Sequence, residues 1–329
     1  MLRIVVGMEL TAERVALGVE RSLPDAVPVR PVAALRRGRG HASWMLDSGL
    51  GRLVAKVALA GHDQVVLDRL AEHRRVFEYG VPVPRLLAFD PDSRAVGGRL
   101  LIVYGYLPGQ DADEAWRSLP GGVMAEVMRA AGGAVAGLHQ VPVGAFGEPV
   151  TGLGAGPGTW GAVIAGRVES LRRSYRESPA VADSAVTAGL ALLGGLADNV
   201  SPVVRPAVCH LDLYLPNILL DGGGRFSALL DLEHVRRVDP VMDFVKPGMW
   251  MLAGRPDWAE AFEGGYREVA GWPECWPERL AAATGLELLT GVGYWARVSD
   301  HQMHDDYLRR LRDWVRSDGS GHVWPSAVS

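Results

Sequence analysis

The sequence predicts an α+β fold in two lobes, a small β-rich one over residues 1–105 and a larger, mainly helical one over residues 106–329. In the first lobe, apolar runs alternate with Gly-rich or polar turns, which is typical of short strands. Beyond about residue 122, apolar residues recur mostly at helical spacing. Strands are expected at 42–46, 53–59 and 99–106, and helices at 122–139, 160–177, 180–197, 257–270 and 276–316.

One helix is expected inside the first lobe, over residues 63–80. Its apolar residues follow the spacing of one helical face: Val66, Leu67, Leu70 and Phe77. Gly80 can end the helix, and the VPVP segment at 81–84 excludes its continuation because proline lacks an N–H. Within the helical lobe, residues 208–232 differ, since short β-like runs there flank a polar loop.

Composition excludes several classes of protein. With 48% hydrophobic residues and a net charge of −4, the chain is a globular protein rather than a disordered or phosphate-binding nucleic-acid protein. No apolar run approaches the roughly 18 residues of a membrane span, and the N-terminus lacks the pattern of a signal peptide. We therefore expect a cytoplasmic protein without membrane or nucleic-acid partners. Cys209 and Cys275 are isolated, which excludes a disulfide framework.

Lysine is scarce: of 34 basic residues, only Lys56 and Lys246 are lysine. Neither follows a glycine, so a Walker A loop is absent. Lys56 lies in a strongly apolar run, where an unpaired ammonium is costly to bury. It therefore needs an anionic partner, either nucleotide phosphates or an acidic side chain. Lys246 precedes Pro247 and is expected in an exposed loop.

The strongest chemical signal is the pair of segments 208–220 and 230–244. His210, Asp212 and Asn217 follow one β-like run, and Asp231 follows another 14 residues after Asn217. Loop Asp and Asn residues often only form turns or caps. This set at this spacing, however, contains what phosphoryl transfer needs: a carboxylate that orients the attacking hydroxyl, and oxygen ligands for Mg²⁺.

These segments resemble those of the aminoglycoside phosphotransferase family, whose members share the protein-kinase fold. The resemblance implies a bilobal protein-kinase-like fold with an antiparallel sheet in the small lobe. It also implies that Asp212 is the catalytic aspartate, braced by His210, and that Asn217 and Asp231 bind Mg²⁺. Asp243, in the DPVMDF stretch, would support the loop from below.

Further segments extend the resemblance over about residues 36–245. RRGRGHAS at 36–43 corresponds to the glycine-rich phosphate loop, LVAKVAL at 53–59 to the strand with the phosphate-binding lysine, and LLIVYGYLPG at 100–109 to the hinge between lobes. GVPVPRLL at 80–87 and AGLHQVPVGAFG at 136–147 match the family's helix-to-strand turn and helix end.

The resemblance also implies a site for ATP or GTP as the phosphoryl donor. Lys56 would bind phosphate and pair with Glu72 of the expected helix, or with Asp68 one turn earlier. The remaining implied nucleotide contacts are the phosphate-loop residues Gly38, Gly40 and Ser43, the hinge backbone of Val103, Tyr104 and Tyr106, and the apolar walls Val54, Leu219 and Leu230. The alternatives are a plain β-turn for the glycines and ordinary core positions for the walls.

The acceptor is expected to be a small molecule. Only 11 residues separate Asp231 from Asp243, too few for the activation segment of a protein kinase. Residues 257–318 hold 12 acidic residues against 7 arginines, which indicates either a pocket for a cationic substrate or an acidic solvated surface. His301 and His304 are interpreted as part of such a surface rather than as a metal site. Seven of the ten tryptophans lie at or after residue 250, as pocket walls or core: Trp250, Trp258, Trp272, Trp276, Trp295, Trp314 and Trp324.

Three functions are compatible with this pattern. The first is phosphorylation of an aminoglycoside, aminocyclitol or related antibiotic, which confers resistance. The second is a metabolic kinase for choline, homoserine or a sugar. The third, an inactive nucleotide-binding protein, is disfavoured by the intact set of Lys56, Asp212, Asn217 and Asp231. Monomer and dimer are both compatible with the sequence.

Overall fold

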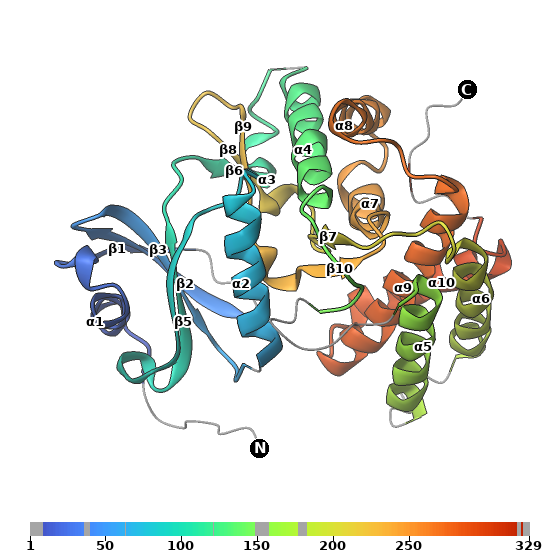
Figure 1. The fold of residues 1–329 in the computed structure, drawn as a ribbon, viewed down its shortest axis with the longest axis horizontal. Coiled ribbons are helices and arrows are strands. Elements are labelled where there is room, and N and C mark those ends of the chain that lie inside the picture. The colour runs from blue at the N-terminus through green and yellow to red at the C-terminus, as the bar shows by residue number, and fades with distance from the viewer. Residues whose placement is uncertain are drawn as a thin grey trace.

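The first lobe contains a five-stranded sheet with two helices. The computed structural model describes residues 9–35, 40–62, 64–120, 122–148, 158–176, 183–320 and 324. The sheet has the order β1-β2-β3-β5-β4, and every neighbouring pair is antiparallel (Figure 1). Its strands are β1 (Arg30–Ala34), β2 (His41–Ser48), β3 (Gly51–Ala58), β4 (Leu86–Ser93) and β5 (Arg99–Gly105). The predicted antiparallel sheet is confirmed.

Helices α1 (Ala12–Ser22) and α2 (Gln64–Glu78) pack against different side-chain clusters of this sheet. Val57 of β3 lies in the cluster with α1, and its neighbour Ala58 lies in the cluster with α2. Because successive strand side chains point to opposite faces, Lys56 lies on the same face as Ala58, toward α2. The predicted helix over 63–80 is therefore present, whereas α1 was not predicted.

The second lobe is mainly helical, as predicted. Its helices are α3 (Ala112–Ala115), α4 (Val123–His139), α5 (Trp160–Arg176), α6 (Ser184–Val200), α7 (Met242–Lys246), α8 (Pro256–Val269), α9 (Trp276–Arg297) and α10 (His301–Arg316). Short strands form where β-like runs were expected: β7 (Ala207–Cys209), β8 (Ile218–Leu220) and β9 (Phe226–Leu229). Two further short strands were not predicted: β6 (Gln110–Asp111), which pairs with β8, and β10 (Arg236–Val238), which pairs with β7.

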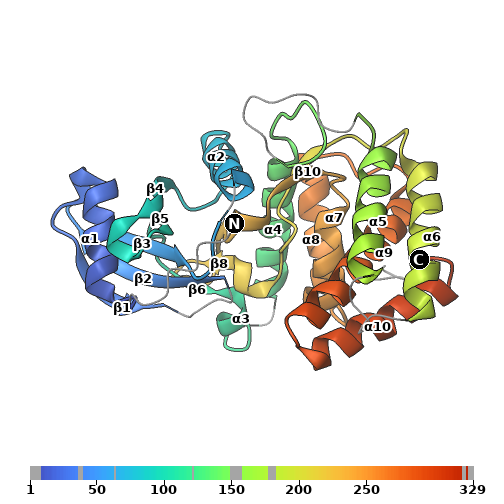
Figure 2. The same cartoon turned by 90° about the horizontal axis from the view of Figure 1, so that it is seen from below.

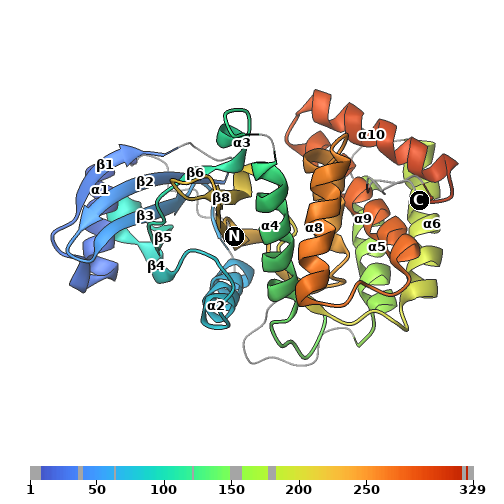
Figure 3. The ribbon, with the colours of Figure 1, turned by 90° about the horizontal axis from the view of Figure 1, so that it is seen from above.

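Helices α4 and α8 lie side by side, and small residues let their backbones approach closely (Figure 3). A Cβ on Gly132 would lie 2.0 Å from the carbonyl oxygen of Phe262, and one on Gly265 would lie 1.8 Å from that of Arg129. Helices α5, α6, α9 and α10 gather at the far end of the lobe (Figure 2).

The sequence predicts one helix over 276–316, but the structure has two. Helix α9 ends at Arg297 and α10 begins at His301. Between them Ser299 has φ 57°, a left-handed conformation that cannot continue a right-handed helix. Asp300 then caps α10 by accepting a hydrogen bond from the Met303 amide.

Helix α2 links the two lobes through ion pairs. Arg69 pairs with Glu148 at 2.9 Å, and Glu72 pairs with Arg237 of β10 at 2.8 Å. Immediately after α2, the Pro82 carbonyl accepts a hydrogen bond from the Leu229 amide at 2.8 Å. The position of α2 against the sheet is therefore fixed partly by the second lobe.

Among the residues that the structure describes, none of the helices has the length and apolarity needed to cross a membrane.

Candidate active site

The loop between β7 and β8 brings His210, Asp212 and Asn217 together. The Asn217 side-chain amide donates to the Asp212 carbonyl at 2.8 Å and lies 3.4 Å from its Oδ2. Nδ1 of the fully buried His210 accepts from the Asp212 amide, so its Nε2–H donates to the Leu230 carbonyl at 2.7 Å. His210 thus links this loop to the segment before Asp231.

Asp243 holds the same loop from below, as expected. Its two carboxylate oxygens accept hydrogen bonds from the backbone amides of His210 at 2.7 Å and Leu211 at 2.6 Å. Leu211 has φ 63°, a left-handed conformation that costs a non-glycine residue about 1 kcal/mol. Burial opposes ionisation of Asp243, but the hydrogen bonds and charge of His139 and the Leu211 amide outweigh it and lower the pKa. The carboxylate therefore stabilises a strained turn next to Asp212.

Asp231 follows β9 and faces the sheet of the first lobe. It also has a left-handed backbone, with φ 65°. The amide of the preceding residue, Leu230, donates to the Asn217 carbonyl at 2.9 Å, and Asp231 Oδ1 lies 2.7 Å from Lys56 Nζ. Residues that are far apart in the sequence thus converge on one site between the lobes.

The expected pair of Lys56 with Glu72 is wrong. Lys56 pairs instead with Asp231 and Glu233. The Lys56 Nζ to Glu233 Oε1 distance is 2.8 Å, and Glu233 Oε2 also contacts His41 at 2.9 Å. Burial lowers the pKa of Lys56, but the charges of Glu233 and Asp231 outweigh it and the pKa is raised. Lys56 is therefore held as an ammonium by two carboxylates of the second lobe.

The predicted partners of Lys56 make other contacts. Glu72 lies between Arg75 and Arg237, and Asp68 accepts a hydrogen bond from Gln64. Sequence spacing cannot reveal the pair of Glu72 with Arg237, because Arg237 lies in a distant strand whose position depends on the whole fold. Glu233 was missed as a partner, although its position two residues after Asp231 placed it close to the site.

The prediction that Lys246 lies in an exposed loop is wrong. It ends α7, and its Nζ lies 2.6 Å from Asp212 Oδ1, with 26% of the side chain exposed. Pro247 does not end the helical path but begins a π-helical turn, Pro247–Met251. Residues three apart share a helix face, so Lys246 lies on the same side of α7 as Asp243. Both lysines of the chain therefore belong to this site.

The expected phosphate-loop residues are only partly described. Ser43 is directly opposite Lys56 in the β2–β3 ladder, and the Gly40 carbonyl accepts a hydrogen bond from the Leu59 amide at 2.9 Å. A Cβ on Gly40 would meet no atom within 4 Å, so this structure shows no steric need for glycine there. Gly38 lies outside the described residues.

The hinge has fewer free backbone groups than expected. Val103 and Tyr104 lie in β5 between β3 and β4, where their backbone faces two neighbouring strands. The Tyr106 amide already donates to the Arg52 carbonyl at 3.1 Å. Of the expected apolar walls, Val54 is paired opposite Tyr104, Leu219 is buried in β8, and Leu230 is half-buried before Asp231.

The side chains of Asn217 and Asp231 suit Mg²⁺. The hydrogen bonds of Asn217 use its amide nitrogen, and the contact of Asp231 with Lys56 uses Oδ1. Within the described part of the chain, the Asn217 amide oxygen and Asp231 Oδ2 are therefore available, and Mg²⁺ prefers such oxygen ligands.

Another buried group can be excluded as a metal site. His139, Cys209 and Asp243 bring ligand atoms within 4.8 Å of one another. His139 is already hydrogen-bonded to Tyr266 and Asp243, however, and Asp243 also receives the two loop amides. These polar atoms are satisfied without an ion. No such group forms around His301 and His304 in the described part of the chain.

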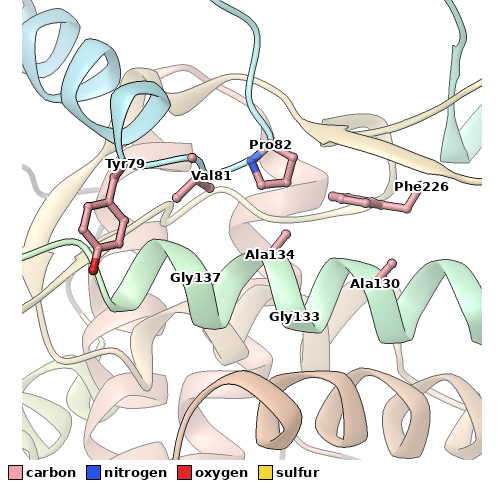
Figure 4. A pocket seen from close by; sticks show the side chains of 9 residues that line it. Tyr79, Val81, Pro82, Ala130, Gly133, Ala134, Gly137 and Phe226 are labelled. Atoms are coloured by element: carbon pink, nitrogen blue, oxygen red, sulfur yellow. The ribbon is translucent and has the colours of Figure 1, made fainter.

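Two hollows lie outside this cluster. One, of about 310 Å³, is formed by α4, the segment after α2 and Phe226, and contains none of the site residues (Figure 4). The other, of about 440 Å³, is lined by Trp250, Gln302, Met303, Asp305, Asp306 and Arg309. Trp250 lies only four residues after Lys246, and its ring is 6.1 Å from that of Tyr307. Tyr307 in turn donates to Glu287 at 3.0 Å. The charge of Glu287 also helps to raise the pKa of Lys246, which pairs with Asp212.

Fold and site together define a phosphotransferase of the protein-kinase-like class. The model of the phosphotransferase enzyme family (APH) matches residues 32–277, and the chain belongs to this family. The protein is accordingly a small-molecule phosphotransferase with a hydroxyl group as acceptor, which confirms the predicted class. No curated protein sequence is significantly similar to this chain.

Solved structures share the fold at low identity. A thermostable mutant of aminoglycoside phosphotransferase APH(4)-Ia, in a ternary complex with AMP-PNP and hygromycin B, has a TM-score of 0.69 and 18% identity, covering 94% of this chain and 100% of its own. The GDP complex of aminoglycoside 2'-phosphotransferase-IIIa has a TM-score of 0.64 and 14% identity, covering 94% and 100%. Macrolide 2'-phosphotransferase type I has a TM-score of 0.59 and 16% identity, covering 93% and 99%.

Proposed function

We propose that this protein transfers the terminal phosphoryl group of ATP or GTP, with Mg²⁺, to a hydroxyl of a small antibiotic of the aminoglycoside or aminocyclitol type. The observation that carries the proposal is the convergence of Lys56, Asp212, Asn217 and Asp231. Two ion pairs connect the aspartates of this set to the two lysines of the chain: Asp231 lies 2.7 Å from Lys56, and Asp212 lies 2.6 Å from Lys246.

In this mechanism Asp212 accepts a hydrogen bond from the acceptor hydroxyl and orients its oxygen toward the phosphoryl group. Lys56 gives up part of its contact with Asp231 and Glu233 and binds the phosphate oxygens instead. The loop that contains Gly40 and Ser43 binds the phosphates together with Lys56. Asn217 and Asp231 would hold Mg²⁺, which supplies neutralisation of phosphate charge when bound. Most of the acceleration then comes from alignment and electrostatic stabilisation.

The acceptor class is supported by the second lobe. The hollow beside Trp250 is lined by Asp305 and Asp306 together with Arg309, and Tyr307 of the same helix contacts Glu287. Carboxylates favour a cationic acceptor. Proteins of the same fold have been solved with hygromycin B and with spectinomycin.

A metabolic kinase for choline, homoserine or a sugar is the second candidate, and one observation favours its sugar form, which has a neutral acceptor. Helix α10 holds three acidic residues against four arginines, and two of the three are paired with arginine: Asp306 contacts Arg309 and Arg310, and Asp313 contacts Arg316. These pairs reduce the charge available to a cationic substrate.

A coupled ADP- or GDP-release screen discriminates the candidates. The acceptor panel contains hygromycin B, other aminoglycosides, spectinomycin, nucleoside and macrolide antibiotics, choline, homoserine and sugars, each with Mg·ATP and Mg·GTP. We expect the highest kcat/KM with a cationic antibiotic. Much faster turnover of a sugar or homoserine would favour the metabolic kinase, and nucleotide binding without any product would favour the inactive protein.

A further inference from the structure

Lys246 is the least expected member of the site. Its Nζ lies 2.6 Å from Asp212 Oδ1, at the end of a helix of only five residues. Burial lowers the pKa of Lys246, but the charges of Glu287 and Asp212 outweigh it and the pKa is raised. The side chain is therefore held as an ammonium.

The contacts of Asp212 divide between its two oxygens. Oδ1 contacts Lys246, and Oδ2 lies 3.4 Å from the Asn217 amide nitrogen, outside the range of a strong hydrogen bond. Lys246 is thus the closest contact that fixes the rotation of this carboxylate among the described residues. Three residues earlier on α7, Asp243 holds the backbone amides of His210 and Leu211. One short helix therefore holds both the backbone of the loop and its carboxylate.

The magnitude of the interaction suggests that its main effect is not on stability. The two side chains are 26% and 20% exposed, and partly exposed ion pairs contribute at most about 1 kcal/mol to folding. Catalysis is more sensitive to geometry, because a misplacement of about 1 Å in a reacting group can lower a rate about 100-fold.

We propose that Lys246 is a positioning residue for phosphoryl transfer, which holds the Asp212 carboxylate in the orientation that accepts the acceptor hydroxyl. The proposal rests on the proposed function, since it assigns that role to Asp212. Lys56 and Lys246 then have matching positions: each pairs with one carboxylate of the motif, Lys56 with Asp231 and Lys246 with Asp212.

The test is a double-mutant cycle on the full chain with Lys246→Met and Asp212→Asn. Activity is measured with Mg·ATP and the panel acceptor of highest turnover, or as ADP release to water if no acceptor is turned over. We expect Lys246→Met to lower kcat by about 30-fold or more, while KM for ATP changes by less than about threefold. In the Asp212→Asn background the same substitution should change kcat by less than about twofold, because Lys246 acts through Asp212.

Three further variants keep the proposal falsifiable. If the Lys246→Met variant fails to fold, the Lys246→Gln variant takes its place in the cycle. Lys246→Arg keeps the charge and should retain at least about one tenth of kcat, since the carboxylate still has a cationic partner. Arg225→Met removes an exposed cation paired with Asp221 in the hairpin after β8 and should leave kcat unchanged.

Wild-type kcat in Lys246→Met, or the same fold-loss in both backgrounds, would overturn the proposal. Full activity of Asp212→Asn alone would overturn the proposed function itself, and this outcome is distinguishable because it does not involve Lys246.

Discussion

Replacing Asp243 with Asn tests whether a buried carboxylate holds the strained loop before Asp212. The substitution keeps the size of the side chain but turns one of its two acceptor oxygens into a donor. In the structure Oδ1 accepts from Leu211, and Oδ2 accepts from His210 and contacts His139 at 3.0 Å. The asparagine side chain of the variant can therefore satisfy only one of the two loop amides.

The expected loss follows from these contacts. A hydrogen bond to a charged group contributes about 1.5–3 kcal/mol, and the amide left unpaired is buried. The left-handed backbone of Leu211 adds about 1 kcal/mol of strain, which the contacts that remain in the variant must offset. We expect Asp243→Asn to lower the free energy of unfolding by about 3–5 kcal/mol at pH 7, a large part of the stability of a typical domain.

Urea unfolding at several pH values measures this loss. Because the folded-state pKa of Asp243 lies below its ordinary value of 3.8, the wild-type carboxylate stabilises the fold above that pH. Its contribution disappears as the pH falls through the folded-state pKa, so the deficit of the variant should shrink below about pH 4. Asp221→Asn is the matched control, since Asp221 also accepts two backbone amides but on an exposed hairpin, and it should lose much less.

Equal stability of Asp243→Asn and wild type at pH 7 would contradict the role of the Asp243 carboxylate in holding this loop. So would a deficit that stays constant from pH 7 to about pH 3, because the lost contacts would then not depend on the carboxylate charge.

Three further predictions concern Lys56, the originally expected partner Glu72 and the helix contact of the second lobe. Lys56→Met should weaken ATP binding by about tenfold or more in calorimetry, and unchanged ATP affinity would contradict the role of Lys56. Because the charges of Lys56 and His41 outweigh burial and hold the pKa of Glu233 below its ordinary value of 4.5, the stability deficit of the variant should shrink as the pH falls below about 4.5. Glu72→Gln should leave ATP affinity within about threefold, because Glu72 contacts arginines instead of Lys56; a tenfold loss would restore the original assignment. Gly132→Ala should destabilise the fold by about 2 kcal/mol or more in thermal melts, because its Cβ would lie 2.0 Å from a carbonyl oxygen. Gly137→Ala in the same helix meets no atom within 4 Å and should be neutral or stabilising by up to about 1 kcal/mol; equal losses at both positions would contradict the close packing of α4 and α8.

Features set by local periodicity were predictable from the sequence. Most helices have one apolar face, and the segments expected at 122–139 and 160–177 became α4 and α5 within a residue of their predicted ends. The break between α9 and α10 was not predictable in this way. It depends on the left-handed Ser299, where no glycine or proline marks the end of a helix.

Pairings in the site depend on how distant elements dock, which the sequence order does not reveal. The motif residues Asp212, Asn217 and Asp231 were identified because their spacing along two adjacent segments is itself informative. The partner of Lys56 was not, since Glu72 has the expected helix position but pairs across the lobes with Arg237. For Lys246, Pro247 suggested an exposed end, whereas the π-helical turn that follows keeps the lysine against Asp212.

Asp212 is the residue proposed to orient the acceptor hydroxyl in phosphoryl transfer. The most direct measurement compares kcat of wild type and Asp212→Asn with Mg·ATP and the best panel acceptor, alongside ATP affinity by calorimetry. We expect kcat to fall by about 1,000-fold or more while ATP affinity stays within about threefold. A variant that keeps near wild-type kcat would contradict the assignment of Asp212 and the mechanism built on it.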